Sequence, residues 1–166
     1  MEKTMLTAKT IVCPTDFSKE SLRALSVASD FASRLDAELL LVNVLTIQPA
    51  IVTDPNYAFV VPEFEQKLRS EIAHQLRELE HELGGKGIRT RTLIGYGDPA
   101  NEIVRIANQE SADLIVIATF GKTGWRRLAF GSVAEKVVRS AACPVLTVRG
   151  SVPAVSDTPI TRSRVA

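Results

Sequence analysis

The sequence has little of what would crosslink the chain or give it a strong charge. It contains two cysteines in 166 residues, Cys13 and Cys143, and each stands before a proline. Their spacing matches neither a zinc site nor a dithiol redox motif, so we expect two small buried side chains in a reducing compartment. The net charge of +1 provides no general field for nucleic acid or an anionic membrane. Electrostatic recognition must therefore be local.

Long hydrophobic runs are also missing. No segment approaches the roughly 18 apolar residues of a membrane-spanning helix, and residues 1–10 lack the apolar core of a secretory signal. We therefore expect a cytoplasmic protein with neither a membrane nor a nucleic acid as its partner. Hydrophobic residues make up 45% of the chain and charged residues 23%, which is typical of a soluble globular protein. The length suits a single domain.

Five short apolar segments have the character of strands. Near-continuous runs such as residues 39–42 and 114–117 indicate parallel strands that are covered on both faces, whereas residues 88–94 alternate and are expected at an edge. The expected strands are residues 10–15, 37–45, 88–94, 113–119 and 144–149.

Segments with helical spacing separate these strands. The first can be capped by Asp16 or Ser18, the second begins at Pro62, and the third follows Pro99. The fourth covers residues 132–141, and residues 46–61 are expected to form an irregular connection. This alternation predicts an α/β fold, a single doubly wound domain with a parallel sheet and helices on both faces. We expect the domain to cover residues 8–149 and the Ser/Thr/Pro-rich residues 150–166 to form a disordered tail.

The segment 118–132 is the most informative part of the chain. It follows an expected strand, contains Gly121 and Gly124, and enters an expected helix at Ser132. Glycines let backbone N–H groups approach an anion, and a helix N-terminus adds unpaired donors and a favourable dipole. Lys122 and Arg126 add positive charge. These features together suit a polyphosphate.

A ligand in an open α/β sheet lies beyond the carboxyl ends of the strands, where the strand order reverses. If the first and fourth strands are neighbours there, Asp16 faces Gly121 and can accept hydrogen bonds from a ribose, while the backbone near Val44 can contact a base. Each feature also has a purely structural interpretation, since Asp16 can cap a helix, the glycines can form a tight turn, and Ser132 suits an N-cap. Neither common nucleotide-binding glycine motif is present. The residues alone leave both interpretations open.

Two stretches resemble the universal stress protein family. They are the opening Ile-Val-Cys-Pro-Thr-Asp-Phe-Ser and the segment from Asp113 to Arg139, and the later Cys-Pro-Val-Leu-Thr-Val continues the match. The resemblance covers residues 8–149. It implies a five-stranded sheet in the order 3-2-1-4-5 and a homodimer joined through the last strand, formed by Val145, Leu146, Thr147 and Val148. An exposed apolar strand edge of this kind invites pairing with a second copy.

The resemblance also implies a nucleotide site. Nucleotide-binding members carry Gly-x-x-Gly-x9-Gly-Ser/Thr, whose second glycine falls on Gly121, third on Gly131 and hydroxyl residue on Ser132. The first glycine is replaced by Ala118, and Phe120 stands where many members have histidine. The family's ribose and adenine segments match residues 14–16 and Val44. The expected site comprises Pro14, Thr15, Asp16, Val44, Ile117, Ala118, Gly121, Lys122, Gly124, Arg126, Gly131, Ser132 and Val133, and the expected ligand is ATP, or ADP or AMP, with Mg²⁺.

Three functions remain open at this point. The first is a dimeric ATP-binding regulator of a stress response. The second is a protein-interaction module of the same fold whose cleft Ala118 and Phe120 have spoiled. The third is an enzyme such as a slow ATP hydrolase, which needs a general base beside the phosphates. No histidine lies near the glycine segment, and His74 and His81 are seven residues apart, unlike the four-residue spacing of metal-binding pairs. We expect no metal held by the protein alone.

Overall fold

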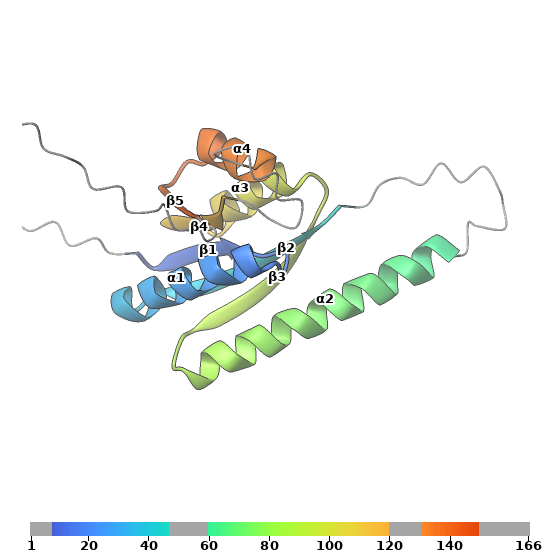
Figure 1. Ribbon diagram of the computed structural model, residues 1–166, viewed down its shortest axis with the longest axis horizontal. Helices are drawn as coiled ribbons and strands as arrows, with labels where there is room; N and C mark the ends of the chain where they lie inside the picture. Colours follow the sequence, from blue (N-terminus) through green and yellow to red (C-terminus); the bar gives the residue numbers. More distant parts are fainter. Residues whose placement is uncertain (1–7, 47–59, 120–130, 150–166) are drawn as a thin grey trace, which may run out of the picture.

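The structure is a computed structural model that describes residues 8–46, 60–119 and 131–149. Within these ranges, parallel strands alternate with helices along the chain (Figure 1). The strands are β1 (Thr10–Pro14), β2 (Glu38–Leu45), β3 (Thr90–Tyr96), β4 (Leu114–Ala118) and β5 (Val145–Val148). The helices are α1 (Lys19–Leu35), α2 (Val60–Gly85), α3 (Pro99–Gln109) and α4 (Ser132–Ser140).

The strands form one sheet in the order β3-β2-β1-β4-β5, and every pairing is parallel. From β1 the chain builds outward through β2 to β3, then crosses to the other side of β1 to form β4 and β5. The expected strand order is confirmed, and β3 lies at an edge as its alternating sequence predicts. The order reverses between β1 and β4, so this is the point where the carboxyl ends of the strands leave room for a ligand.

The helices cover both faces of the sheet, as predicted. Successive side chains of a strand point to opposite faces, so Ile11 and Cys13 of β1 pack in a cluster with α1 and α2, whereas Val12 packs in a second cluster with α3 and α4. Figure 1 shows the two helix pairs on opposite sides of the sheet. The central strands are therefore mostly apolar, because helices cover both faces of the sheet.

Two elements begin two residues away from their predicted starts, whereas the boundaries of the other strands agree to within one residue. β3 covers residues 90–96 instead of 88–94, because its ladder follows the length of β2, from Leu39 opposite Thr90 to Leu45 opposite Tyr96. α2 begins at Val60, before the predicted start at Pro62. Pro62 still falls in the first turn of the helix, where a backbone N–H has no intrahelical partner and its loss costs little.

The cysteine prediction holds for Cys13 and only in part for Cys143. Cys13 is fully buried, which raises the pKa of its thiol to about 12, and both thiols are free. Cys143 is half-buried, because it lies in the turn that leads to the edge strand β5. Among the described residues, no helix is long and apolar enough to cross a membrane. The expected tail at residues 150–166 lies outside the described residues.

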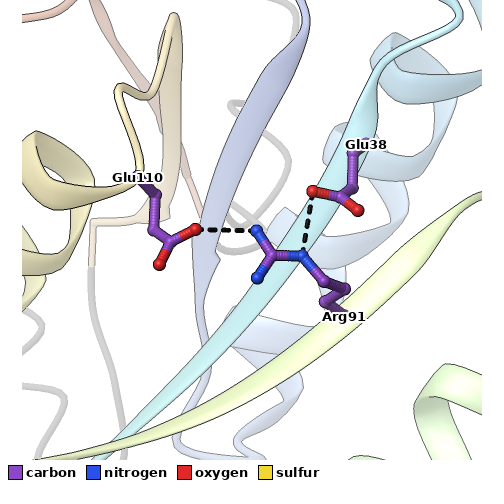
Figure 2. A network of polar contacts seen from close by, with 3 residues as sticks. All are labelled: Glu38, Arg91 and Glu110. Carbon is purple, nitrogen blue, oxygen red and sulfur yellow. Dashed lines mark hydrogen bonds and ion pairs between the residues drawn. The ribbon is translucent and has the colours of Figure 1, made fainter.

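An arginine joins three elements at the amino ends of the strands. The guanidinium of Arg91 on β3 donates to Glu38 of β2 through Nε at 2.9 Å and to Glu110, just after α3, through Nη2 at 2.7 Å (Figure 2). The hydrogen bonds to Glu110 and Glu38 raise the pKa of Arg91 above its usual value. This network ties β3, β2 and the end of α3 together at the amino ends of the strands. The room for a ligand lies at the other end of the sheet, at the carboxyl ends of the strands.

Gly95 provides a test of the packing between β3 and α3. A Cβ atom at this position would lie 2.5 Å from Cγ of Glu102 and 3.2 Å from Cδ1 of Ile106. We therefore expect Gly95→Ala to lower the free energy of unfolding by about 1–3 kcal/mol, as overpacking does. The control is Gly84→Ala on α2, where nothing lies within 4 Å; we expect it to change stability by less than about 1 kcal/mol, in the stabilising direction. Equal urea-unfolding midpoints for the two variants would contradict the packing.

Asp113 provides a test of how β4 is held to β1. Its Oδ2 atom accepts hydrogen bonds from the backbone N–H groups of Lys9 at 2.7 Å and Thr10 at 3.0 Å, and these bonds lower the pKa of the carboxyl. We expect Asp113→Ala to cost about 1 kcal/mol at neutral pH, because the site is exposed and screened. The contribution of a depressed carboxyl pKa is present above the unfolded value of 3.8 and is lost as the pH falls through the folded value.

The stability difference between wild-type and Asp113→Ala should therefore be constant from neutral pH down to about pH 5 and shrink below about pH 4. Urea titrations across this range measure it. A difference that stays unchanged in acid would show that the carboxylate's charge is not what holds the two strands.

Candidate functional site

A cleft of about 300 Å³ opens at the reversal point of the sheet. It lies at the carboxyl ends of β1, β2 and β4 and at the beginning of α4, and its volume is at the lower end of known ligand sites. Its lining consists of Pro14, Thr15, Asp16, Ser21, Val42, Asn43, Val44, Thr46, Pro99, Ile103, Ile117, Ala118, Thr119, Gly131, Ser132, Val133 and Ala134.

Buried hydrogen bonds hold the turn that follows β1. The backbone N–H of Thr15 donates to the carbonyl of Val42 at 2.8 Å, and Nδ2 of Asn43 donates to the carbonyl of Thr15 at 2.8 Å. The hydroxyls of Thr15 and Ser21 lie 3.0 Å apart. The backbone N–H of Phe17, at a φ of 61°, donates to Oγ1 of Thr15 at 3.1 Å. The turn is thus fastened to β2 and α1, and it carries Asp16 at a defined place on the cleft wall.

The carboxylate of Asp16 belongs to this turn and is not the helix cap. Its Oδ1 atom accepts from the backbone N–H of Ser18 at 3.0 Å. Ser18 is the N-cap of α1, and its hydroxyl accepts from the N–H of Ser21 at 3.1 Å. Of the two residues that could cap α1, Ser18 makes the cap, and Asp16 accepts a hydrogen bond from Ser18 and lies half-buried on the lining of the cleft.

Thr119 and Gly131, on either side of the segment 120–130 that lies outside the described residues, belong to the other wall. The backbone N–H of Gly131 donates to the carbonyl of Thr119 at 2.7 Å, and the N–H of Thr119 donates to the carbonyl of Val148 at 2.9 Å. Thr119 is itself almost fully buried. Thr119 and Gly131 are therefore held to each other and to β5 beside the cleft.

α4 begins at Ser132, as predicted, but Ser132 is not its N-cap. The N-cap is Gly131, which has no side chain to make a capping hydrogen bond, and Ser132 is the first helical residue. The predicted N-cap role of Ser132 is therefore wrong, because the extended residue before the helix is Gly131, at φ −75° and ψ 156°. The first backbone bond of the helix runs from the N–H of Glu135 to the carbonyl of Gly131 at 3.0 Å.

The N–H groups of Ser132, Val133 and Ala134 consequently precede the hydrogen-bonded part of α4. A helix leaves its first N–H groups without an intrahelical acceptor, and its dipole makes this end positive. All three residues line the cleft, and no side chain caps the helix among the described residues. This end of the cleft suits an anion.

The remaining wall is apolar. Val42 and Val44 of β2, Ile103 of α3 and Ile117 of β4 line it, and Pro99 begins the helix beside it. Such a surface suits a flat, weakly polar ring better than a charged group. Asp16 is the one carboxylate on the described lining, which contains no histidine, cysteine or basic side chain. No three His, Cys, Asp or Glu side chains are arranged as a metal site among the described residues.

The structure brings nine of the predicted site residues together on this lining: Pro14, Thr15, Asp16, Val44, Ile117, Ala118, Gly131, Ser132 and Val133. Gly121, Lys122, Gly124 and Arg126 lie outside the described residues. Sequence reasoning missed Asn43 and Thr119. Asn43 could have been noticed as the polar residue that interrupts the apolar run of β2, and Thr119 as the polar residue that directly follows the run of β4.

Comparison with known proteins agrees with this architecture. The family model described as the universal stress protein family matches residues 7–149. Universal stress protein MJ0531 of Methanocaldococcus jannaschii is 38% identical over 141 residues, which cover 85% of this chain and 82% of that protein.

Solved structures of similar proteins have the same fold. Universal stress protein UspA from Lactobacillus plantarum superposes with a TM-score of 0.76 at 26% identity, covering 86% of this chain and 99% of that one. A universal stress protein in complex with cAMP superposes with a TM-score of 0.64 at 25% identity, covering 87% of this chain and 99% of that one. On the family match and these relatives, the chain belongs to the universal stress protein family.

Proposed function

We propose that this protein binds an adenine nucleotide, ATP or its products ADP and AMP, in the cleft between β1 and β4 and acts as a dimeric, nucleotide-dependent regulator of a stress response. The observation that carries the proposal is that the start of α4, whose N-cap Gly131 makes no side-chain capping hydrogen bond, lines the same cleft as Asp16. A phosphate chain at one end and a sugar at the other match these two chemistries.

The phosphates belong at the start of α4. Backbone N–H groups at a helix N-terminus bind phosphate without any basic side chain, and Gly131 leaves the approach free of a Cβ atom. The hydroxyl of Ser132 adds one donor at the same place. Mg²⁺ would be bound by the phosphates and water, since it typically takes few ligands from the protein; in the cleft it would neutralise the triphosphate.

The nucleoside belongs on the side of β1 and β2. The carboxylate of Asp16 can accept hydrogen bonds from ribose hydroxyls, and charged acceptors make the stronger ones. The base fits between the apolar side chains of Val42, Val44 and Ile103, and backbone groups at Val44 can select adenine by its edge. Ala118 adds one methyl group to the wall and leaves it apolar.

Two further facts support a binding role. A relative of the same fold, at 25% identity, was solved in complex with cAMP, an adenine nucleotide. Asp16 is the single titratable side chain on the described lining, and in the proposed pose it is occupied by the sugar. General acid–base catalysis needs a positioned proton acceptor beside the reacting group, so we propose binding as the function and assign no catalytic residue.

Asp16→Ala tests the nucleotide site. Titration calorimetry with ATP and magnesium should show one nucleotide per chain for the wild-type, with about a tenfold or greater loss of affinity in the variant, because a charge-assisted hydrogen bond contributes about 1.5–3 kcal/mol. The matched control is Asp30→Ala, which removes an exposed carboxylate from α1 and should leave the affinity unchanged.

The proposal also predicts that purified protein releases adenine nucleotide when it is denatured. No heat with ATP, ADP or AMP, together with protein that carries no nucleotide, would reject it and favour the interaction module. Circular dichroism of Asp16→Ala checks that the turn after β1 still folds.

The dimer is proposed through β5, the short strand at one edge of the sheet. The N–H of Ile115 donates to the carbonyl of Pro144, and the N–H of Thr119 donates to the carbonyl of Val148. Since strand residues alternate, the backbone groups of residues 144, 146 and 148 face β4, and those of Val145 and Thr147 face outward. These outward groups are available for a second copy of the strand.

Thr147→Pro tests this interface. It removes an outward N–H without touching the ladder to β4, and proline is tolerated on an edge strand. We expect a dimer by light scattering at micromolar concentration for the wild-type and for the control Thr147→Val, which keeps the N–H, and a monomer for Thr147→Pro. A monomeric wild-type protein would contradict the dimer. A dimer that survives in Thr147→Pro would show that its interface does not lie along β5.

A further inference from the structure

We propose that the groove between α2 and β3 is a docking site for an extended acidic peptide segment of a partner protein, which adds as a further strand to the edge of β3 that faces away from β2. The groove has a volume of about 460 Å³ and lies on the opposite edge of the sheet from β5. Its lining is Arg69, Ala73, Leu76, Arg77, Glu80, Thr92, Leu93 and Ile94.

The first support is the edge itself. Among the described strands, β3 has a neighbour only on its β2 side. It is seven residues long, contains no proline, and is longer than the four-residue edge strand β5. Natural proteins usually blunt such an edge, since its unpaired N–H and C=O groups are a template for another strand. Figure 1 shows α2 running alongside β3, so a peptide placed at this edge would lie beside the helix.

Hydrogen bonds to β2 identify which groups of β3 are available. The N–H of Leu39 donates to the carbonyl of Arg89 at 2.8 Å, and the N–H of Gly97 donates to the carbonyl of Leu45 at 2.9 Å. Odd-numbered residues of β3 therefore turn their backbone groups toward β2, and even-numbered residues turn them outward. The backbone N–H and C=O groups of Thr92 and Ile94 therefore face away from β2, and both residues line the groove.

The second support is the pair of arginines that α2 contributes to the groove. Arg69 and Arg77 stand on either side of Ala73, and neither forms an ion pair with another described residue. Arg69 lies over the ring of Tyr96 with 6.0 Å from its Cζ to the ring centroid, which holds its guanidinium at the end of the groove. The carboxylate of Glu80 is already engaged at the other end, where it accepts from the hydroxyl of Thr92 at 3.3 Å.

The spacing of these side chains matches a strand. Residues 69, 73 and 77 lie four apart on α2, which places neighbours about 6 Å apart along the helix axis. Alternate residues of an extended peptide lie about 6.7 Å apart on one face. A peptide with acidic residues at positions i and i+4 and an apolar residue at i+2 would therefore place its carboxylates at Arg77 and Arg69 and its apolar side chain over Ala73, against Leu76 and Ile94.

This mode of recognition divides affinity and specificity between two sources. Main-chain hydrogen bonds to Thr92 and Ile94 would supply affinity, and the two arginines and the small residue between them would select the side chains. The site uses none of the residues of the nucleotide cleft, so failure of the nucleotide proposal would leave it intact.

The test uses the full chain and a labelled peptide, acetyl-Ser-Glu-Thr-Leu-Thr-Glu-Ser-amide, in fluorescence anisotropy. We expect saturable binding that weakens with salt and weakens tenfold or more in the double variant Arg69→Glu/Arg77→Glu. The matched control, Arg23→Glu/Arg34→Glu, reverses two exposed arginines of α1 and should bind as the wild-type does. A peptide with lysine in place of both glutamates should bind tenfold or more weakly to the wild-type.

Amide hydrogen exchange distinguishes strand addition from simple charge attraction. Saturation with the peptide should slow exchange at the N–H groups of Thr92 and Ile94 at least tenfold and leave Leu93 and Gly95, which already face β2, unchanged. N-methylation of the peptide amides that face the edge should abolish binding.

Three results would overturn the proposal: no saturable binding up to millimolar peptide, equal affinity for the charge-reversed variant, or unchanged exchange at Thr92 and Ile94 in the saturated complex. Protection of these two amides in the protein alone, growing with protein concentration, would show that a second copy of the chain occupies this edge, and would also overturn it.

Discussion

Parallel pairing of β1 with β4 is the constraint on which the candidate site depends. Ile11 pairs with Leu114 and Val12 with Ile115, so residues about a hundred positions apart in the chain run in register. Because both strands run in the same direction, the turn that carries Asp16 and the residue Thr119 both follow the carboxyl ends of their strands, at the same end of the sheet. The chain then diverges, to α1 on one face and α4 on the other, and the space between them is the cleft.

The walls of this cleft are held by hydrogen bonds that water cannot easily replace. Asn43 and Ser21 fasten the turn after β1, and Thr119 joins Gly131 to β5. No buried side-chain nitrogen or oxygen among the described residues lacks a partner, and breaking one of these bonds would leave a buried polar group unsatisfied. The polar groups that a nucleotide would meet are therefore positioned before it binds, which reduces the ordering that binding requires.

The two edges of the sheet are different surfaces. β5 is short and packed against β4, with its outward backbone groups at Val145 and Thr147. β3 is longer, tied at its amino end through Arg91 to Glu38 and Glu110, and bordered by the arginines of α2. The proposals above assign a second copy of the chain to one edge, a partner protein to the other, and a nucleotide to the cleft between them. Such a division would suit a regulator, because each partner would contact a separate region of the sheet.

The sequence by itself determined the class of fold, the number and order of most elements, and nine residues of the cleft. Hydrophobic periodicity and glycine placement are local properties, and the resemblance to a family supplied the strand order. The cap of α4, the extent of β3, and the roles of Asn43 and Thr119 were decided by tertiary structure. Whether Ser132 or Gly131 precedes the helix depends on the bond that Gly131 makes to Thr119, and the end of β3 depends on the length of β2. Such partners lie far away along the chain, and no local pattern specifies where a distant acceptor will be.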